Sequence, residues 1–105
     1  MHDATALILT SLASGPKHGY ALLKDIESYA GVTLGPGTLY GAISRLEARG
    51  LIASDGTEGR KRPYRLTADG TATLESTVAD LRTVVDEATV RLARLPRLAG
   101  EGGLA

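Results

Sequence analysis

The sequence predicts a mostly α-helical fold with a small β-hairpin, and three features of its 105 residues indicate this class. Three short segments space their apolar residues as helices do, and glycine or proline bounds each of them. Two short strand patterns then flank a turn-rich stretch, and a long helical pattern fills most of the remaining chain. With 43% hydrophobic and 23% charged residues, the composition fits one globular domain.

The three short helices are predicted at residues 4–14, 19–30 and about 36–49. Gly15-Pro16 ends the first helix. Gly31 suits the position after the second helix, because glycine adopts the left-handed conformation without a steric penalty. Pro36 suits the first position of the third helix, and Gly50 ends that helix.

The hairpin is predicted from two strands at residues 51–53 and 64–66, with turn residues between them. Thr67 is a suitable N-cap for the last helix, and Pro96 ends it. Three short helices followed by a two-stranded wing form the layout of a winged helix-turn-helix. We therefore expect a winged helix-turn-helix domain at residues 1–66, followed by a long C-terminal dimerisation helix at residues 67–96. A flexible tail is expected at residues 97–105.

The third helix has two contrasting faces. The stripe predicted to face the core consists of Leu39, Ala42, Ile43 and Leu46. The opposite and flanking positions hold small side chains or hydrogen-bond donors: Gly37, Tyr40, Gly41, Ser44, Arg45 and Ala48. Small residues allow the backbone to enter a major groove, and the donors suit phosphates or base edges. The alternative is a glycine-weakened helix that packs on another part of the protein.

The formal net charge is zero, but basic residues gather around the hairpin. Arg60, Lys61, Arg62 and Arg65 place four positive charges within six residues. Between residues 36 and 65 there are six basic and three acidic residues. Such a loop beside the third helix suits contact with DNA phosphates, although a charge run is also common in a solvated loop.

The last helix carries a heptad pattern typical of helix-on-helix packing. Its apolar positions follow spacings of 4, 3, 4, 3, 4 and 3 through Leu74, Val78, Leu81, Val85, Ala88, Leu92 and Leu95. A helix of this length, about 40 Å, exceeds what three short helices can cover. We expect a symmetric homodimer, with Leu9 of the first helix as a further interface candidate. Packing of the last helix against the first helix of the same chain is the alternative.

Several spaced motifs resemble those of the PadR family of transcriptional regulators, over about residues 5–75. They are Gly15-Pro16-Lys17-His18-Gly19-Tyr20, Gly37-Thr38-Leu39-Tyr40, Arg45-Leu46-Glu47, Gly50-Leu51-Ile52, the Arg60–Arg62 wing and Tyr64-Arg65-Leu66-Thr67 with Gly70. The resemblance implies a homodimer, usually a repressor, bound to a palindromic operator in double-stranded DNA. It also places Tyr40 on the tyrosine of the family's recognition helix.

The same resemblance implies DNA contacts at the start of the second helix. Lys17, His18 and Tyr20 fall on the family's segment at the entry to the second helix, where a helix N-terminus is suited to meet a phosphate. A structural turn role for His18 is an equally good interpretation. Some short relatives bind planar drugs between aromatic side chains at the dimer interface. The last helix here has no aromatic residue, which does not favour that mode, and the sequence identifies no effector.

Other classes of protein are less consistent with the residues. The two histidines, His2 and His18, are isolated, and cysteine is absent, so neither an enzyme nor a metal site is expected. We expect no cofactor, and the sequence has neither a signal-peptide pattern nor an apolar run that would span a membrane. We therefore expect a cytoplasmic DNA-binding regulator that releases its operator on an unidentified signal. The main alternative is a winged-helix module that binds protein rather than DNA.

Overall fold

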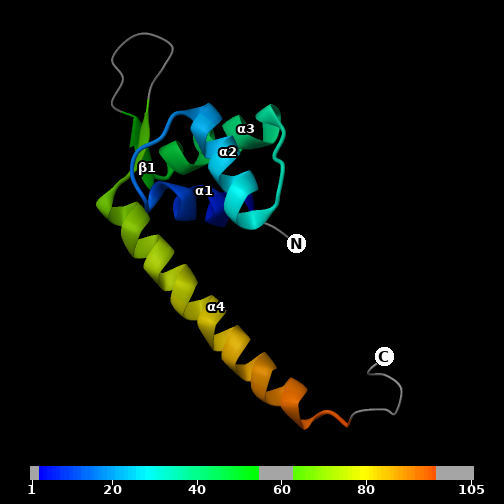
Figure 1. The fold of residues 1–105 in the computed structure, drawn as a ribbon. Helices are drawn as coiled ribbons and strands as arrows, with labels where there is room; N and C mark the ends of the chain where they lie inside the picture. Colours follow the sequence, from blue (N-terminus) through cyan, green and yellow to red (C-terminus); the bar gives the residue numbers. More distant parts are fainter. Residues whose placement is uncertain (1–2, 55–62, 97–105) are drawn as a thin grey trace.

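The computed structural model describes residues 3–54 and 63–96, and within them the predicted fold class is confirmed (Figure 1). The elements follow in the order α1 (Ala4–Leu12), α2 (Gly19–Ala30), α3 (Pro36–Ala48), β1 (Ile52–Ser54), β2 (Tyr64–Leu66) and α4 (Ala68–Arg94). The first three helices pack together, the hairpin lies beside them, and α4 projects away. The predicted tail at 97–105 and most of the predicted turn lie outside the described residues.

Helix α1 ends earlier than the sequence pattern predicts. Its N-terminus is capped by Asp3, whose side chain accepts a 3.0 Å hydrogen bond from the amide of Thr5. At the other end, the amides of Ala13 and Ser14 bond to carbonyls three residues back, at 3.1 and 3.3 Å. This tightening of the last turn closes the helix at Leu12 instead of residue 14.

The boundaries of α2 and α3 follow the predicted signals. Gly31 adopts the left-handed conformation with φ 68°, and Pro36 is the first residue of α3. After α3, Gly50 has φ 74°, its amide bonds to the Glu47 carbonyl at 2.9 Å, and the Leu51 amide bonds to the Leu46 carbonyl at 3.0 Å. This is a Schellman motif. Because Leu51 closes the helix, β1 begins one residue later than predicted.

The two strands are antiparallel, with Ile52 paired to Leu66 and Ser54 to Tyr64. A third extended position, Lys17, joins the free edge of β2 and was not predicted. Its amide bonds to the Tyr64 carbonyl at 3.0 Å, and the Tyr64 amide bonds back at 2.8 Å. The connection between α1 and α2 is therefore tied to the base of the wing.

One hydrophobic core joins α1, α2, α3 and the hairpin. Its buried members are Ile8, Leu9, Leu12, Leu22, Ile26, Leu39, Ala42, Ile43, Leu46, Leu51 and Ile52. Leu9 is only 1% exposed, so its side chain packs inside its own chain and has no surface left for a partner. Its assignment to a dimer interface is therefore corrected: Leu9 is a core residue.

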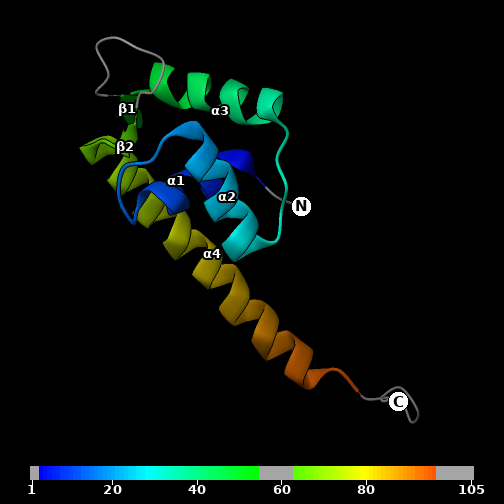
Figure 2. The same ribbon diagram turned by 45° about the horizontal axis from the view of Figure 1, so that its top comes forward.

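Among the described residues, helix α4 is anchored to the rest of the fold only at its start. Thr67 is its N-cap, as predicted, and the Thr67 side chain accepts from the Gly70 amide at 3.0 Å while donating to the Gly50 carbonyl at 2.6 Å. The first turns contact α1 and β2, and Leu74 packs against the core. Figure 2 shows the rest of α4 leaving the other elements, and every residue from Val78 to Pro96 is exposed.

The projecting helix sets the shape of the molecule. The principal extents are 63 × 26 × 20 Å, and the radius of gyration is 17.8 Å. A compact chain of this length would have a radius of gyration of about 13 Å. Among the described residues, no helix has both the length and the hydrophobicity needed to cross a bilayer.

Candidate nucleic-acid interface

The orientation of α3 follows from its apolar stripe. Leu39, Ala42, Ile43 and Leu46 are all buried, which confirms the predicted core-facing side. The opposite side is therefore turned outward. It exposes Gly37, Thr38, Tyr40, Ser44 and Arg45, with Gly41 half-buried among them. Within the described residues, the alternative of a glycine-weakened helix packed on another element is not observed, since a methyl group added at Gly37 would meet no atom within 4 Å.

Arg45 lies along this outer face rather than across it. A Cβ at Gly41 would be 3.6 Å from an Nη atom of the Arg45 guanidinium. The small residue therefore leaves room for the arginine one turn further on to lie against the helix. Arg49 follows on the next turn and is also exposed. The outer face thus combines small side chains with positive charge.

The N-terminus of α2 is the second exposed feature beside α3. His18 is the N-cap, but its side chain makes no capping hydrogen bond, so no histidine cap satisfies the first amides of α2. Tyr20 is 70% exposed, and the Lys24 ammonium lies 5.9 Å from the centre of its ring. The positive end of the α2 dipole therefore faces outward, together with the side chains of Tyr20 and Lys24, which both carry hydrogen-bond donors.

Tyr40 connects the two helices. A Cβ built on Gly19, the first residue of α2, would overlap the Tyr40 hydroxyl and would lie 2.8 Å from Cζ of the same ring. The ring of Tyr40 therefore lies across the start of α2, although 48% of the residue stays exposed. The structure brings the predicted residues of α2 and α3 onto one surface.

Lys17 is turned away from this surface. Its ammonium donates to the Ser11 carbonyl at 2.5 Å, to Oγ of Ser14 at 2.7 Å and to the Gly15 carbonyl at 3.4 Å. A cation at this position complements the negative end of the α1 dipole. The sequence motif suggested a DNA contact, whereas the structure shows a cap on α1. A lysine a few residues after a predicted helix end was the signal for this role.

The wing residues divide between described and undescribed positions. Arg60, Lys61 and Arg62 lie outside the described residues. Arg65 lies on β2, opposite Ala53, and is exposed. The predicted phosphate contacts of the wing therefore remain predictions.

Comparison with known proteins identifies the chain. The model of the transcriptional regulator PadR-like family matches residues 8–76, about two thirds of the sequence. The chain belongs to the PadR family. Because the members of this family are transcriptional regulators, the chain is a regulator and not an enzyme.

Two relatives match most of the chain. A transcriptional regulator of Mycobacterium tuberculosis is 36% identical over 98 residues, which cover 90% of this chain and 88% of that protein. An uncharacterised 37.1 kDa protein in transposon TN4556 of Streptomyces fradiae is 50% identical over 74 residues. Those residues are 70% of this chain, but they span only 21% of the length of the transposon protein.

Solved structures confirm the PadR fold. A PadR family regulator from Clostridium difficile superposes with a TM-score of 0.74 and 28% identity, covering 85% of this chain and 97% of that one. A PadR family regulator from Eggerthella lenta gives a TM-score of 0.73 and 31% identity, covering 87% and 82%. The predicted winged helix-turn-helix with a long C-terminal helix is the PadR arrangement.

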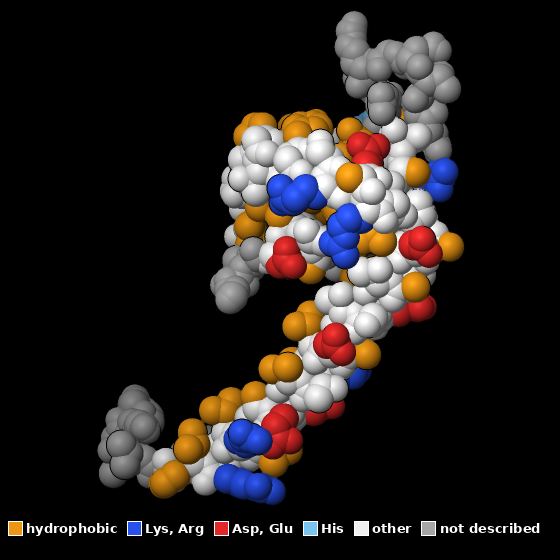
Figure 3. All heavy atoms as spheres, turned by 180° about the vertical axis from the view of Figure 1, so that it is seen from behind, with side chains coloured by type: hydrophobic (Ala, Val, Ile, Leu, Met, Phe, Trp, Pro, Cys, Tyr) orange, Lys and Arg blue, Asp and Glu red, His pale blue; other side chains and the backbone are white. Residues whose placement is uncertain are grey.

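The PadR match ends at residue 76, close to the point where α4 leaves the other elements. Before that point, the predicted heptad residue Leu74 packs on the core of its own chain, and beyond it the predicted heptad residues are all exposed. Figure 3 shows hydrophobic side chains in a row along one edge of α4. Val78, Leu81, Val85, Leu92 and Leu95 are each at least 44% exposed. The structure therefore leaves an apolar stripe without cover in the described chain.

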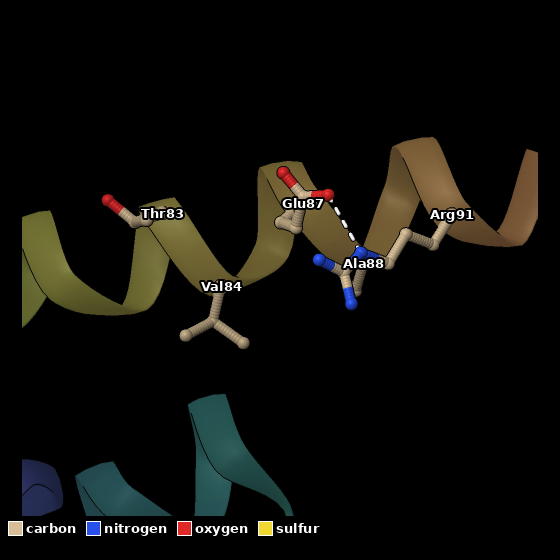
Figure 4. Close-up of a pocket in the computed structure, with 5 residues that line it drawn as sticks. All are labelled: Thr83, Val84, Glu87, Ala88 and Arg91. Carbon is tan, nitrogen blue, oxygen red and sulfur yellow. Dashed lines mark hydrogen bonds and ion pairs between the residues drawn. The ribbon is translucent and has the colours of Figure 1, made fainter.

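The stripe is wider than the heptad pattern indicated. An open hollow of about 370 Å³ is lined by Thr83, Val84, Glu87, Ala88 and Arg91 (Figure 4). Val84 is 63% exposed, and Nε of Arg91 pairs with Oε2 of Glu87 at 2.8 Å on the rim. The predicted heptad stripe omitted Val84, because a heptad pattern includes only two of every seven positions. A stripe that also includes the position next to Val85 would have contained Val84.

Proposed function

We propose that this PadR-family regulator is a homodimer that binds a palindromic operator in double-stranded DNA and represses transcription until a signal releases it. The single observation that carries the proposal is the outward face of α3. There a small-residue surface with Tyr40, Ser44 and Arg45 stands beside the N-terminus of α2. A helix face of this kind can approach base edges, while the neighbouring helix end suits a phosphate.

The roles of the residues follow from their positions. Gly37, Thr38, Gly41, Ser44 and Arg45 lie on the exposed or half-exposed side of α3, where they suit base edges and nearby phosphates. His18, Tyr20 and Tyr40 lie around the start of α2, where they suit the phosphate backbone. Arg65 and the arginines and lysine of the wing add sequence-independent affinity through counterion release.

The apolar stripe of α4 supports the homodimer. Exposed leucines and valines at heptad spacing favour burial against a second helix, because each fully buried side chain contributes about 1.5–3 kcal/mol. A second copy supplies the same stripe, and two-fold symmetry then presents two α3 helices to two half-sites. Repression and signal release rest on the family resemblance. No resident cofactor forms part of the proposal, and the chemistry of the effector stays open.

Selection of bound DNA from a random pool tests the proposal directly. The purified protein is incubated with random duplexes, and the retained sequences are determined after several rounds. We expect an enriched inverted repeat whose half-sites are separated by about one helical turn. If no sequence is enriched while the protein is folded, the proposal is overturned in favour of a winged-helix module that binds protein. A reporter gene placed behind the selected site then distinguishes repression from activation.

A further inference from the structure

We propose that Gly19 is a positioning residue, and that its missing side chain provides the site in which the Tyr40 ring is held for DNA binding. The proposal rests on the proposed function, because the benefit of a held Tyr40 is measured at the operator. Its geometric part, however, concerns the free protein and is testable without DNA.

The contact between Gly19 and Tyr40 is close and specific. The three atoms nearest to a Cβ at Gly19 all belong to Tyr40: the hydroxyl oxygen, Cζ at 2.8 Å and Cε1 at 3.2 Å. Gly19 is buried, although its neighbours His18 and Tyr20 are exposed. A buried glycine between two exposed residues at the start of a helix indicates that the Tyr40 ring covers it.

Backbone conformation does not explain the glycine. The glycines with positive φ in the described chain are Gly15, Gly31 and Gly50, so Gly19 has a backbone that alanine also adopts. Alanine is the better helix former, whereas glycine leaves the unfolded chain more freedom and weakens a helix. The disadvantage of alanine at this position is that its methyl group would occupy the space that the Tyr40 ring fills.

The consequence concerns the orientation of the α3 surface. Tyr40 lies on the exposed side of α3 but rests with its hydroxyl end over α2, so its position is limited by a second helix. A side chain already held in place loses less conformational entropy when it binds. Removing the space at Gly19 would force the ring away from α2. Because only the far end of a rotatable side chain is displaced, the protein should still fold.

Three variants separate positioning from a simple structural role: Gly19→Ala, Tyr40→Ala and the double variant. Their affinities for the selected operator are measured by fluorescence anisotropy at one salt concentration. We expect Gly19→Ala to weaken binding about tenfold, while its melting temperature is unchanged or higher. In the Tyr40→Ala background, the same change should produce no further loss, because Gly19 acts through the ring. Gly35→Ala, which adds a methyl group in open space at the start of α3, is the matched control and should stay within about twofold.

Each outcome has a distinct meaning. Full affinity in Gly19→Ala, or losses that multiply in the double variant, would overturn the positioning role while leaving the proposed function intact. If wild-type protein enriches no DNA sequence, both proposals fall together. Proton NMR of the free protein tests the geometry alone: nuclear Overhauser contacts between the Tyr40 ring and the α-protons of Gly19 are expected. Their absence would refute the inference whatever the DNA result.

Discussion

The α-carbon of Gly70, in the first turn of α4, lies directly against the backbone carbonyl of Leu51. A Cβ at Gly70 would overlap the Leu51 oxygen and would lie 3.0 Å from the Leu51 carbonyl carbon and 3.2 Å from Cδ2 of Leu66. The same Leu51 carbonyl accepts a hydrogen bond from the Thr67 amide at 3.1 Å. The start of the long helix is therefore held against the residue that closes α3, so the direction of α4 is set at this contact.

We expect Gly70→Ala to lower the free energy of unfolding by about 2–3 kcal/mol, because the added methyl group meets backbone atoms that cannot rotate away. Urea denaturation followed by circular dichroism measures the change. Gly37→Ala is the control, since its added methyl group meets nothing within 4 Å. The control should be neutral or slightly stabilising. Equal effects of the two substitutions would contradict the close contact.

Lys17→Met separates capping from DNA contact at one residue. The ammonium bonds to the Ser11 carbonyl in the last turn of α1 and to Oγ of Ser14, so its loss should reduce the free energy of unfolding by about 1–2 kcal/mol. The slope of operator affinity against salt concentration should stay unchanged. A slope reduced by about one unit, without a change in stability, would instead assign Lys17 to a phosphate.

Tyr29 gives the stability a dependence on pH. Its hydroxyl donates to the Leu7 carbonyl at 2.7 Å, and burial raises the pKa of Tyr29 above its ordinary value near 10. A group whose pKa is raised in the folded state stabilises fully below its unfolded pKa and loses this contribution as pH rises through the folded value. Stability should therefore fall above about pH 10.

Tyr29→Phe tests this assignment. The variant should lose about 1 kcal/mol at neutral pH and should show a weaker decline in stability above about pH 10. Chemical denaturation at a series of pH values measures both effects. Tyr20→Phe, at a more exposed tyrosine on the same helix (70% against 45% for Tyr29), is the control and should retain the wild-type profile. An unchanged decline in Tyr29→Phe would assign the pH dependence to another group.

Leu81→Glu combined with Leu92→Glu should produce a monomer, because both exposed side chains belong to the apolar stripe. Val90→Glu is a matched control on α4. Val90 is 43% exposed, but it lies about half a turn away from Leu81 in helical projection. Light scattering gives the mass of each variant. A dimeric mass for the double variant, or a monomeric control, would refute the stripe as the interface.

Arg45→Ala and a triple alanine change at Arg60, Lys61 and Arg62 should affect DNA binding differently. If Arg45 reads a base, its loss should reduce operator affinity by about 1–3 kcal/mol and relax selectivity at one position. The triple change should weaken binding to all DNA sequences. It should also reduce the slope of log affinity against log salt concentration by the equivalent of up to about three phosphate contacts. Competition assays against variant operators at several salt concentrations measure both. Wild-type behaviour in both variants would contradict the assignment of this surface.

The sequence by itself determined which elements form and most of their limits. Gly31, Pro36, Gly50 and Thr67 act within one turn of their own helices, so their roles are visible from local order. The same holds for the core stripe of α3, because residues three and four positions apart share a helix face. The predicted limits were wrong only where a final turn tightened, as at Leu12, or where Leu51 was used to close α3.

Tertiary structure alone decided how the elements meet. Leu9 became core and Lys17 became a cap, because these assignments depend on what lies opposite each residue. The contacts of Gly19 with Tyr40 and of Gly70 with Leu51 join residues about 20 positions apart, which no local spacing encodes. A glycine required by a neighbour's side chain looks the same in sequence as one required by a turn. Only packing in three dimensions distinguishes the two.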